Sequence, residues 1–229
     1  MANDGIFILG STGPTGEIVT HDLIAAGRRV VVMHRSNKHS EKFQSMGATV
    51  VSGDAMDRDS IFSATHFASS TCNVVLNLIG GSPFEDSDSW PDFAGTVNAV
   101  DAAIAANIPT MVLVTSVGTG NSRQWVPEES FLIPLLELKT KAEDYLTEST
   151  LNNIILKPGG LGPPDWENTP GEILVTENHG IRGLLAREEL ARTIVQILMN
   201  SMERCFSKKL YIVSQKFEKH AGEPDRFDI

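Results

Sequence analysis

The sequence predicts an α/β fold in which helices cover both faces of a doubly wound, mostly parallel sheet. Two observations support this prediction. Apolar runs rich in β-branched residues alternate with segments of helical periodicity almost to the end of the chain. The first run, 6–9, has no polar alternation, which suits a strand buried on both faces. Since no linker interrupts the 229 residues, we expect a single domain, 1–229.

The expected elements alternate along the chain until residue 157. After the first strand, further strands are predicted at 30–33, 49–52, 73–79, 110–115, 154–157 and 210–213. Helices are predicted after residue 16 and at 40–46, 60–67, 91–106, from 131 or later to 148, and 187–199. Residues 162–185 are expected to form an irregular substrate-side loop region, and the charged tail 215–229 is expected to pack poorly.

The first strand ends at GSTGPTG, where three glycines are spaced by threes. Gly10 permits a tight turn, Gly13 lets a bulky anion approach the backbone, and Gly16 lets the next helix lie close to the strand. Pro14 suits the first turn of that helix, so the neighbouring N–H groups can point at a diphosphate. This pattern favours a Rossmann-type dinucleotide site over a merely structural turn. The residues assigned to it are Gly10, Thr12, Gly13, Pro14, Thr15 and Gly16.

A basic turn follows the second strand. NAD-binding folds usually carry an acidic residue there, which binds the ribose 2′-hydroxyl. This chain instead has Arg35 and Ser36, with Lys38 nearby. Because a guanidinium and a hydroxyl suit a 2′-phosphate, NADP(H) is favoured over NAD(H) as the cofactor. The alternative is a solvated basic turn.

Two further turns follow strands and are predicted to contact the cofactor. Asp54, beside Ala55, follows the third strand, where its carboxylate can accept a hydrogen bond from the adenine amino group or cap the next helix. Ile79 and Gly80 follow the fourth strand, where glycine allows a ligand to approach the backbone or simply permits a turn.

Composition excludes several classes of function. The net charge of −10, from 19 basic and 29 acidic residues, argues against non-specific binding to nucleic acid or an anionic membrane. Cys72 and Cys205 form no C-x-x-C pair, which predicts reduced thiols and a cytoplasmic protein. No export signal or membrane-spanning run is predicted. The acidic loop 85–92 lacks calcium-loop spacing and the six histidines form no ligand cluster, so no metal is expected. Monomer and dimer both stay open.

Thr115 and Ser116 follow the fifth strand, and Lys139 precedes Ala142-Glu143 on the next helix. With GSTGPTG, the Arg35 turn and LKPGG at 156–160, these residues make the chain resemble the short-chain dehydrogenase/reductase superfamily, in its atypical NAD(P)H-binding branch. The resemblance is closest to the biliverdin-IXβ reductase/flavin reductase group. It implies NADPH as hydride donor and a flat, conjugated small molecule as acceptor.

The chain departs from the catalytic pattern Tyr-x-x-x-Lys of that superfamily. Lys139 aligns with the lysine, and Leu135 takes the place of the tyrosine. Without the phenol, alcohol/ketone chemistry loses an acid/base group that commonly contributes about 10²- to 10⁴-fold. A flavin, quinone or bilin takes hydride onto a conjugated system and a proton from solvent, so it does not need the phenol. A second departure is that Pro158-Gly159 stands in the segment that reads Pro-Pro-His in the biliverdin-IXβ group.

The resemblance assigns two catalytic residues. Ser116 is predicted to contact the substrate or the nicotinamide, although its hydroxyl would equally bond nearby backbone. Lys139 is predicted to hold the nicotinamide ribose, the alternative being a surface lysine. Pro158 and Gly159 end the sixth strand and are assigned to the cofactor site, unless they only turn the chain.

Three aromatic residues lie in loops expected to frame the acceptor: Trp125, Phe131 and Trp166. They would wall a slot for a planar ring, or only anchor long loops. The sequence thus predicts an NADPH-dependent reductase of a planar conjugated acceptor. The alternative is a non-catalytic NADP(H)-binding redox sensor or assembly factor. An NAD⁺-dependent epimerase or dehydratase is disfavoured by Leu135 and Arg35 together.

Overall fold

The structure is a computed structural model that describes residues 4–82, 90–162, 172–214 and 226–229. Its strands are β1 (Gly5–Leu9), β2 (Val30–His34), β3 (Thr49–Ser52), β4 (Cys72–Asn77), β5 (Thr110–Val114), β6 (Asn152–Pro158), β7 (Gly160–Leu161), β8 (Ile173–Thr176), β9 (Leu184–Leu185) and β10 (Lys208–Ser214). Its α-helices are α1 (Pro14–Ala25), α2 (Ser40–Met46), α3 (Arg58–Ser69), α4 (Ala94–Ala105), α5 (Ile133–Glu148) and α6 (Arg187–Gln196).

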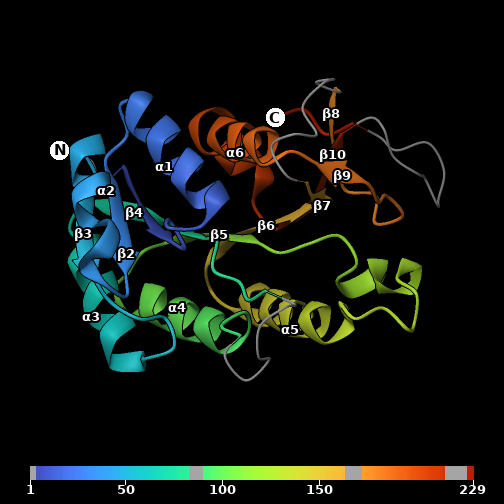
Figure 1. Cartoon of the computed structure of the whole chain (residues 1–229), viewed down its shortest axis with the longest axis horizontal. Helices are drawn as coiled ribbons and strands as arrows, with labels where there is room; N and C mark the ends of the chain where they lie inside the picture. Colours follow the sequence, from blue (N-terminus) through green and yellow to red (C-terminus); the bar gives the residue numbers. More distant parts are fainter. Residues whose placement is uncertain (1–3, 83–89, 163–171, 215–225) are drawn as a thin grey trace.

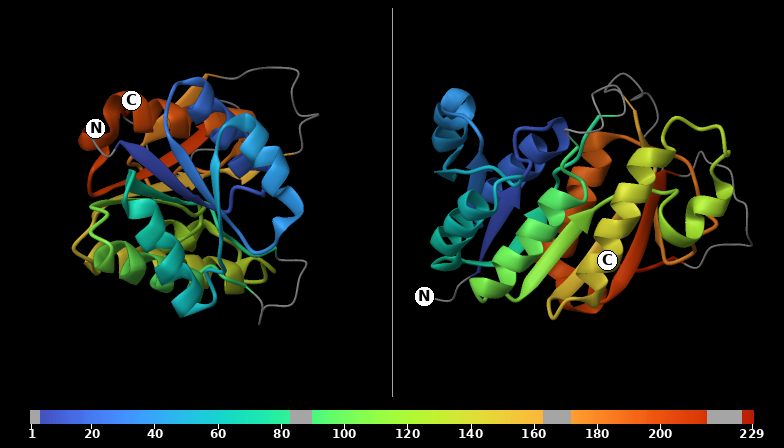
Figure 2. Two further views of the ribbon diagram at one scale, coloured as in Figure 1. Left: turned by 90° about the vertical axis from the view of Figure 1, so that its left-hand side faces the viewer. Right: turned by 90° about the horizontal axis from the view of Figure 1, so that it is seen from below.

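Within these residues, the strands form an eight-stranded sheet in the order β3-β2-β1-β4-β5-β6-β10-β8. All neighbours in it are parallel except β10 and the edge strand β8. Helices α1 and α6 cover one face of the sheet, and α3, α4 and α5 cover the other (Figure 1). Figure 2 shows the latter three side by side beneath the strands. The predicted doubly wound, Rossmann-type fold is therefore confirmed.

Strand β1 shows why its sequence lacks polar alternation. Ile6 and Ile8 face the α1–α6 side and belong to the core there, whereas Phe7 and Leu9 face the α3–α4–α5 side. All four side chains are buried, because helices cover both faces. The glycine turn therefore follows an inner strand of the sheet, between β2 and β4.

The prediction of an irregular segment up to residue 185 was wrong in part. Residues 173–176 form the edge strand β8, which pairs antiparallel with β10 in the register Val175 to Ile212. The short strand β9 pairs with β7. These strands have four and two residues, so local pattern gives little signal for them, and the pairing partner decides their conformation.

The tail also differs from the prediction. The Phe227 N–H donates to the Val175 carbonyl at 2.7 Å, and Phe227 and Ile229 pack against the core of the α1–α6 side. The prediction of a poorly packed tail is therefore wrong for residues 226–229, because two apolar side chains bury against β8 and α6. Residues 215–225 lie outside the described part of the chain. No helix in the described part has the length and apolar character needed to cross a membrane.

Candidate functional site

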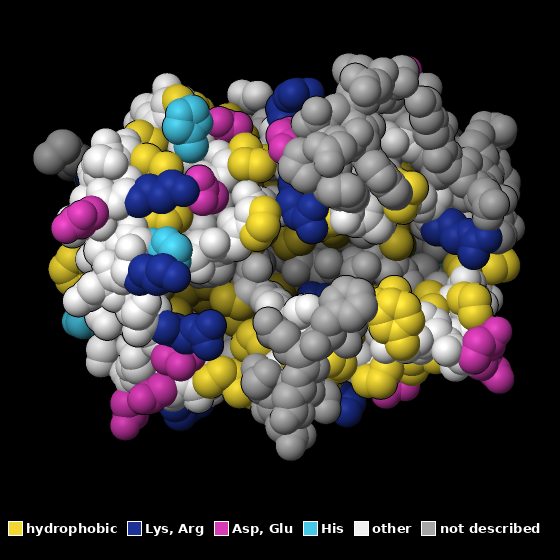
Figure 3. Space-filling view, viewed as in Figure 1, with side chains coloured by type: hydrophobic (Ala, Val, Ile, Leu, Met, Phe, Trp, Pro, Cys, Tyr) yellow, Lys and Arg dark blue, Asp and Glu magenta, His cyan; other side chains and the backbone are white. Residues whose placement is uncertain are grey.

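A cavity of about 310 Å³ opens where β1, β2 and β4 end. The strand order reverses between β1 and β4, and ligands of open α/β sheets bind at such a reversal. Figure 3 shows the molecule hollowed at the centre of its view, with Lys, Arg and His side chains on the side of β2 and α2. The cavity is lined by Gly10, Thr12, Gly13, Met33, His34, Arg35, Gly53, Asp54, Ala55, Met56, Leu78, Ile79, Gly80, Gly81 and Pro91.

Most residues predicted to contact the cofactor come together in this cavity. Its lining includes Gly10, Thr12, Gly13, Arg35, Asp54, Ala55, Ile79 and Gly80. Pro14, Thr15 and Gly16 form the adjoining first turn of α1, and Ser36 follows Arg35. Pro158 and Gly159 are not part of its lining. Met33 and Leu78 line it without having been predicted, because they read as core residues of their strands.

The geometry of the glycine turn fits a bound diphosphate. Gly10 has φ +83°, and a Cβ there would lie 2.7 Å from the Leu78 carbonyl carbon. A Cβ on Gly16 would lie 2.3 Å from the Gly10 carbonyl oxygen, so only glycine lets α1 start so close to β1. At Gly13 the nearest atom is 3.4 Å away, which leaves room beside the backbone. Pro14 occupies the first turn of α1, as predicted. The N-terminus of α1 is thus open to an anion.

His34 ends β2 and was not predicted to belong to the site. Its Nε2 lies 3.1 Å from the Ser11 hydroxyl, and both side chains are buried. Burial, followed by the nearby His39, lowers the pKa of His34, which favours the neutral ring. Arg35, the next residue, is exposed and lines the cavity. The end of β2 therefore places a cation and a neutral ring at the cavity, and no carboxylate; the binding of a 2′-phosphate there stays a prediction.

Asp54 does not cap the helix that follows it, which was the alternative to adenine binding. Asp57 does so, with its Oδ1 accepting the Ser60 N–H at 3.1 Å. The Asp54 carboxylate accepts the N–H of Met56 at 2.9 Å, closing a local turn at the cavity. Adenine recognition by Asp54 stays a prediction.

Lys139, on α5, lies behind Gly80, which lines the cavity at the end of β4. The Lys139 ammonium lies 2.5 Å from Asp92 Oδ1, and a Cβ on Gly80 would lie 3.2 Å from that ammonium. Lys139 is therefore not a solvated surface lysine: 14% of its side chain is exposed, against 1% for Asp92. Asp92 was not predicted, because in the sequence it belongs to an acidic run before a helix.

No other tyrosine supplies the phenol that is missing at position 135, where the superfamily pattern has tyrosine and this chain has leucine. Leu135 is buried on α5. Tyr145 donates its hydroxyl to Asp101 at 2.8 Å, and this bond raises its pKa. Tyr211 is buried in β10, where burial raises its pKa to about 12. The sequence has two tyrosines, so neither offers a phenol of lowered pKa.

A buried ion pair fixes the turn that carries Ser116. Glu143 on α5 and Lys157 on β6 are 0% and 1% exposed, with 2.9 Å between Oε2 and Nζ. The other Glu143 oxygen accepts the hydroxyls of Thr115, at 2.7 Å, and Thr119. Lys157 also donates to the Thr119 carbonyl at 3.1 Å. Residues 115–119 are thereby held between α5 and β6. In the sequence, Glu143 and Lys157 belong to the segments that carry the family resemblance, but nothing in the sequence indicates that they form an ion pair.

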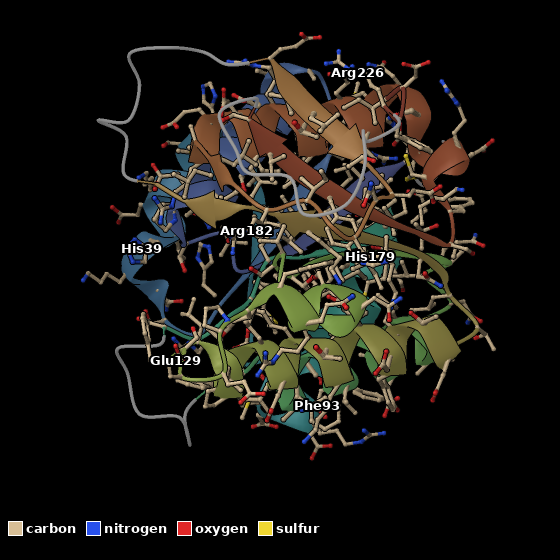
Figure 4. The ribbon with its side chains drawn as sticks, turned by 90° about the vertical axis from the view of Figure 1, so that its right-hand side faces the viewer. His39, Phe93, Glu129, His179, Arg182 and Arg226 are labelled. Carbon is tan, nitrogen blue, oxygen red and sulfur yellow. The ribbon has the colours of Figure 1, made fainter. Side chains whose placement is uncertain are left out.

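The predicted acceptor walls are only partly described. Trp125 is half-buried at the end of the 3-10 helix Gly120–Trp125, and its carbonyl accepts from Arg182 at 3.5 Å. Phe131 is 63% exposed. Trp166 lies outside the described residues. Figure 4 shows Arg182 and His179 between the layer of β8 and β10 and the helices below. A slot for a planar ring stays a prediction.

Gly159 has a structural explanation independent of a cofactor. A Cβ there would lie 2.4 Å from the Gly183 carbonyl oxygen, and the next N–H, of Gly160, donates to that oxygen at 2.8 Å. This close backbone contact joins the end of β6 to the segment before β9.

Among the described residues, no three His, Cys, Asp or Glu side chains gather as metal ligands. The acidic loop lies largely outside them. Cys72 and Cys205 are both buried free thiols, and burial raises the pKa of each.

A family model described as NAD(P)H-binding matches residues 10–201. The chain belongs to this NAD(P)H-binding family. The match begins at the first glycine of the turn and includes every residue that lines the cavity.

Curated relatives fall into different functional groups. The chain is 29% identical over 235 residues to the protein TIC 62, chloroplastic, of Arabidopsis thaliana, covering 93% of this chain and 36% of TIC 62. It is 25% identical over 207 residues to YhfK of Bacillus subtilis, an uncharacterized sugar epimerase. This match covers 88% of this chain and 92% of YhfK. It is 24% identical over 157 residues to the photosystem II assembly factor Ycf39 of Cyanophora paradoxa. This match covers 68% of this chain and 45% of Ycf39. The chain thus spans about a third of the length of TIC 62. Because TIC 62 is a chloroplastic protein, the cytoplasmic localisation of this chain stays a prediction.

Solved structures support the fold. ChuY, an anaerobillin reductase from Escherichia coli O157:H7, superposes with a TM-score of 0.80 at 23% identity, covering 93% of this chain and 98% of ChuY. A short-chain dehydrogenase/reductase from Veillonella parvula in complex with NADP superposes with a TM-score of 0.71 at 18% identity. The superposition covers 94% of this chain and 96% of the Veillonella protein.

Proposed function

We propose that this protein is an NADPH-dependent reductase that transfers hydride to a planar conjugated acceptor of the flavin, quinone or bilin type. The observation that carries the proposal is the combination of two features. Arg35 and the neutral His34 line the cavity, where they would face the 2′-phosphate of the adenosine ribose, and Leu135 replaces the phenol that alcohol/ketone chemistry needs.

Bound NADPH would supply a hydride, which is two electrons and one proton. A conjugated acceptor delocalises the resulting negative charge and takes its second proton from water, so no tyrosine is required. In this proposal Ser116, on the turn fixed by Glu143 and Lys157, contacts the acceptor or the nicotinamide. The anaerobillin reductase ChuY supports this acceptor class by analogy of fold only.

The second candidate is a non-catalytic NADP(H)-binding sensor or assembly factor. It is favoured by the same Leu135 and by the likeness to Ycf39, whose name is that of an assembly factor. The two candidates share the cofactor cavity and differ only in whether bound NADPH is oxidised.

The deciding experiment measures NADPH oxidation by the purified protein with FMN, a quinone and biliverdin, beside a titration of NADPH affinity. We expect turnover with at least one acceptor, and the best one names the substrate class. Tight binding without turnover would favour the sensor or assembly role. Absence of NADPH binding would overturn both candidates.

A further inference from the structure

Asp92, just before α4, connects two parts of the site. Its Oδ1 lies 2.5 Å from the Lys139 ammonium on α5, and its Oδ2 accepts the Gly81 N–H at 2.7 Å. The carboxylate is almost completely buried. One side chain thus ties the lysine of the family motif to the backbone that follows β4.

This ion pair lies directly behind the cavity wall. A Cβ built on Gly80 would lie 3.2 Å from both Asp92 Oδ1 and Lys139 Nζ, and Gly80, Gly81 and Pro91 all line the cavity. A side chain at position 80 would therefore press on both the carboxylate and the ammonium, which would have to shift by a few tenths of an ångström.

The same stretch of backbone is also held from its other end. Asn77, fully buried at the end of β4, accepts the Ile79 N–H at 3.1 Å and donates to the Thr96 hydroxyl of α4 at 3.1 Å. Residues 77–81 are therefore fixed by Asn77 and by Asp92. A wall fixed at both ends suits a ligand that must lie in one orientation.

Stability alone is a poor explanation for this pair. Removing a carboxylate and an ammonium from water costs about as much as their attraction returns, and well-packed apolar residues often replace such a pair without loss. Lys139 also has no phenol to act on, because position 135 is leucine. Its ammonium instead lies behind Gly80 in the cavity wall, paired with Asp92.

The position of the pair identifies the part of the cofactor it would serve. Arg35, at the end of β2, marks the adenosine end of the cavity, and Gly80 lies across the strand reversal at the end of β4. We propose that Asp92 is a positioning residue that holds the Lys139 ammonium and the Gly80–Gly81 backbone where the nicotinamide-side ribose binds. This inference rests on the proposed NADPH binding.

The test compares NADPH with adenosine 2′,5′-bisphosphate, which carries only the adenosine half. Asp92→Asn keeps an acceptor for the Gly81 N–H but removes the charge that holds Lys139. We expect about tenfold weaker binding of NADPH and a change of less than about twofold for the bisphosphate, both measured by titration. Lys139→Met should give the same loss, and the double variant should lose no more than either single one, because the two residues act as a unit.

Asp101→Asn is the matched control, since Asp101 lies on α4 and pairs with Arg58 and Tyr145. It should leave both affinities unchanged. Equal losses for both ligands, additive losses in the double variant, or no loss at all would overturn the role of Asp92. If Asp92→Asn does not fold, Lys139→Met, which breaks the same ion pair, should still give the selective loss. A wild-type protein that binds neither ligand would instead overturn the proposed function.

Discussion

The cofactor side and the proposed acceptor side of the site are built by different means. On the cofactor side, short turns after β1, β2 and β4 make the cavity, and its shape depends on where a Cβ is missing. On the acceptor side, the Ser116 turn is held by the buried pair Glu143–Lys157, from two elements that meet only in the folded chain. The first side therefore depends on close backbone approach, and the second on a buried pair of opposite charges.

The largest expected effect is the fall in the free energy of unfolding when the buried pair Glu143–Lys157 is broken. Glu143→Ala leaves the Lys157 ammonium buried without its carboxylate, which should lower the free energy of unfolding by about 3–5 kcal/mol. Urea denaturation measures this. Asp144→Ala, at the next and 61% exposed position, should cost less than about 0.5 kcal/mol. A loss below about 1 kcal/mol for Glu143→Ala would show that the pair does not hold the acceptor side.

The acceptor side should also lose stability at high pH, through Tyr211. Burial raises the pKa of Tyr211 from 10.0 to about 12, so the folded state favours the neutral phenol. This contribution is complete below pH 10 and is lost as the pH rises to about 12, by about 2–3 kcal/mol. Urea unfolding across that range should show a smaller decline for Tyr211→Phe. Equal declines in both proteins would contradict this origin.

On the cofactor side, two glycines of one turn should behave differently. Gly16→Ala places a Cβ against the Gly10 carbonyl and should cost about 1–3 kcal/mol of stability. Gly13 has φ −73°, which alanine adopts, and no crowded neighbour. Gly13→Ala should therefore leave thermal unfolding nearly unchanged and weaken NADPH binding about tenfold, by entering the space for the diphosphate. If both variants lose only stability, the turn is structural.

The smallest of these effects is a change of cofactor preference. Arg35→Ala should weaken NADPH binding about tenfold, because an exposed guanidinium contributes one or two charge-assisted bonds to a 2′-phosphate. NADH affinity, measured by the same titration, should change less than about twofold. Equal losses for the two cofactors would remove the assignment of Arg35 to the 2′-phosphate.

The cofactor side was the more predictable one because its signals are local. Gly10, Gly13 and Arg35 were assigned from their place after a strand, and all three line the cavity. His34 was overlooked although it directly follows the predicted strand 30–33, because the basic residue Arg35 beside it was the one that suited a phosphate. A partnered, buried histidine has no signature in the sequence.

Prediction failed where distant residues decide the structure. Residues 173–176 form a strand only because β10 lies beside them, and Phe227 packs because β8 offers an edge. Asp92 gave no signal of its own. Its role depends on Lys139, which is 47 residues away in the chain.

The sequence by itself determined the alternation of strands and helices as far as β6, the glycine turn, the cation after β2 and the missing tyrosine at Leu135. Each follows from sterics, periodicity or residue identity within a few positions. Only the tertiary structure decided the pairs Glu143–Lys157 and Asp92–Lys139, the edge strand and the packed tail. Pairing of charges and of strand edges depends on distances and desolvation that exist only after the chain has folded.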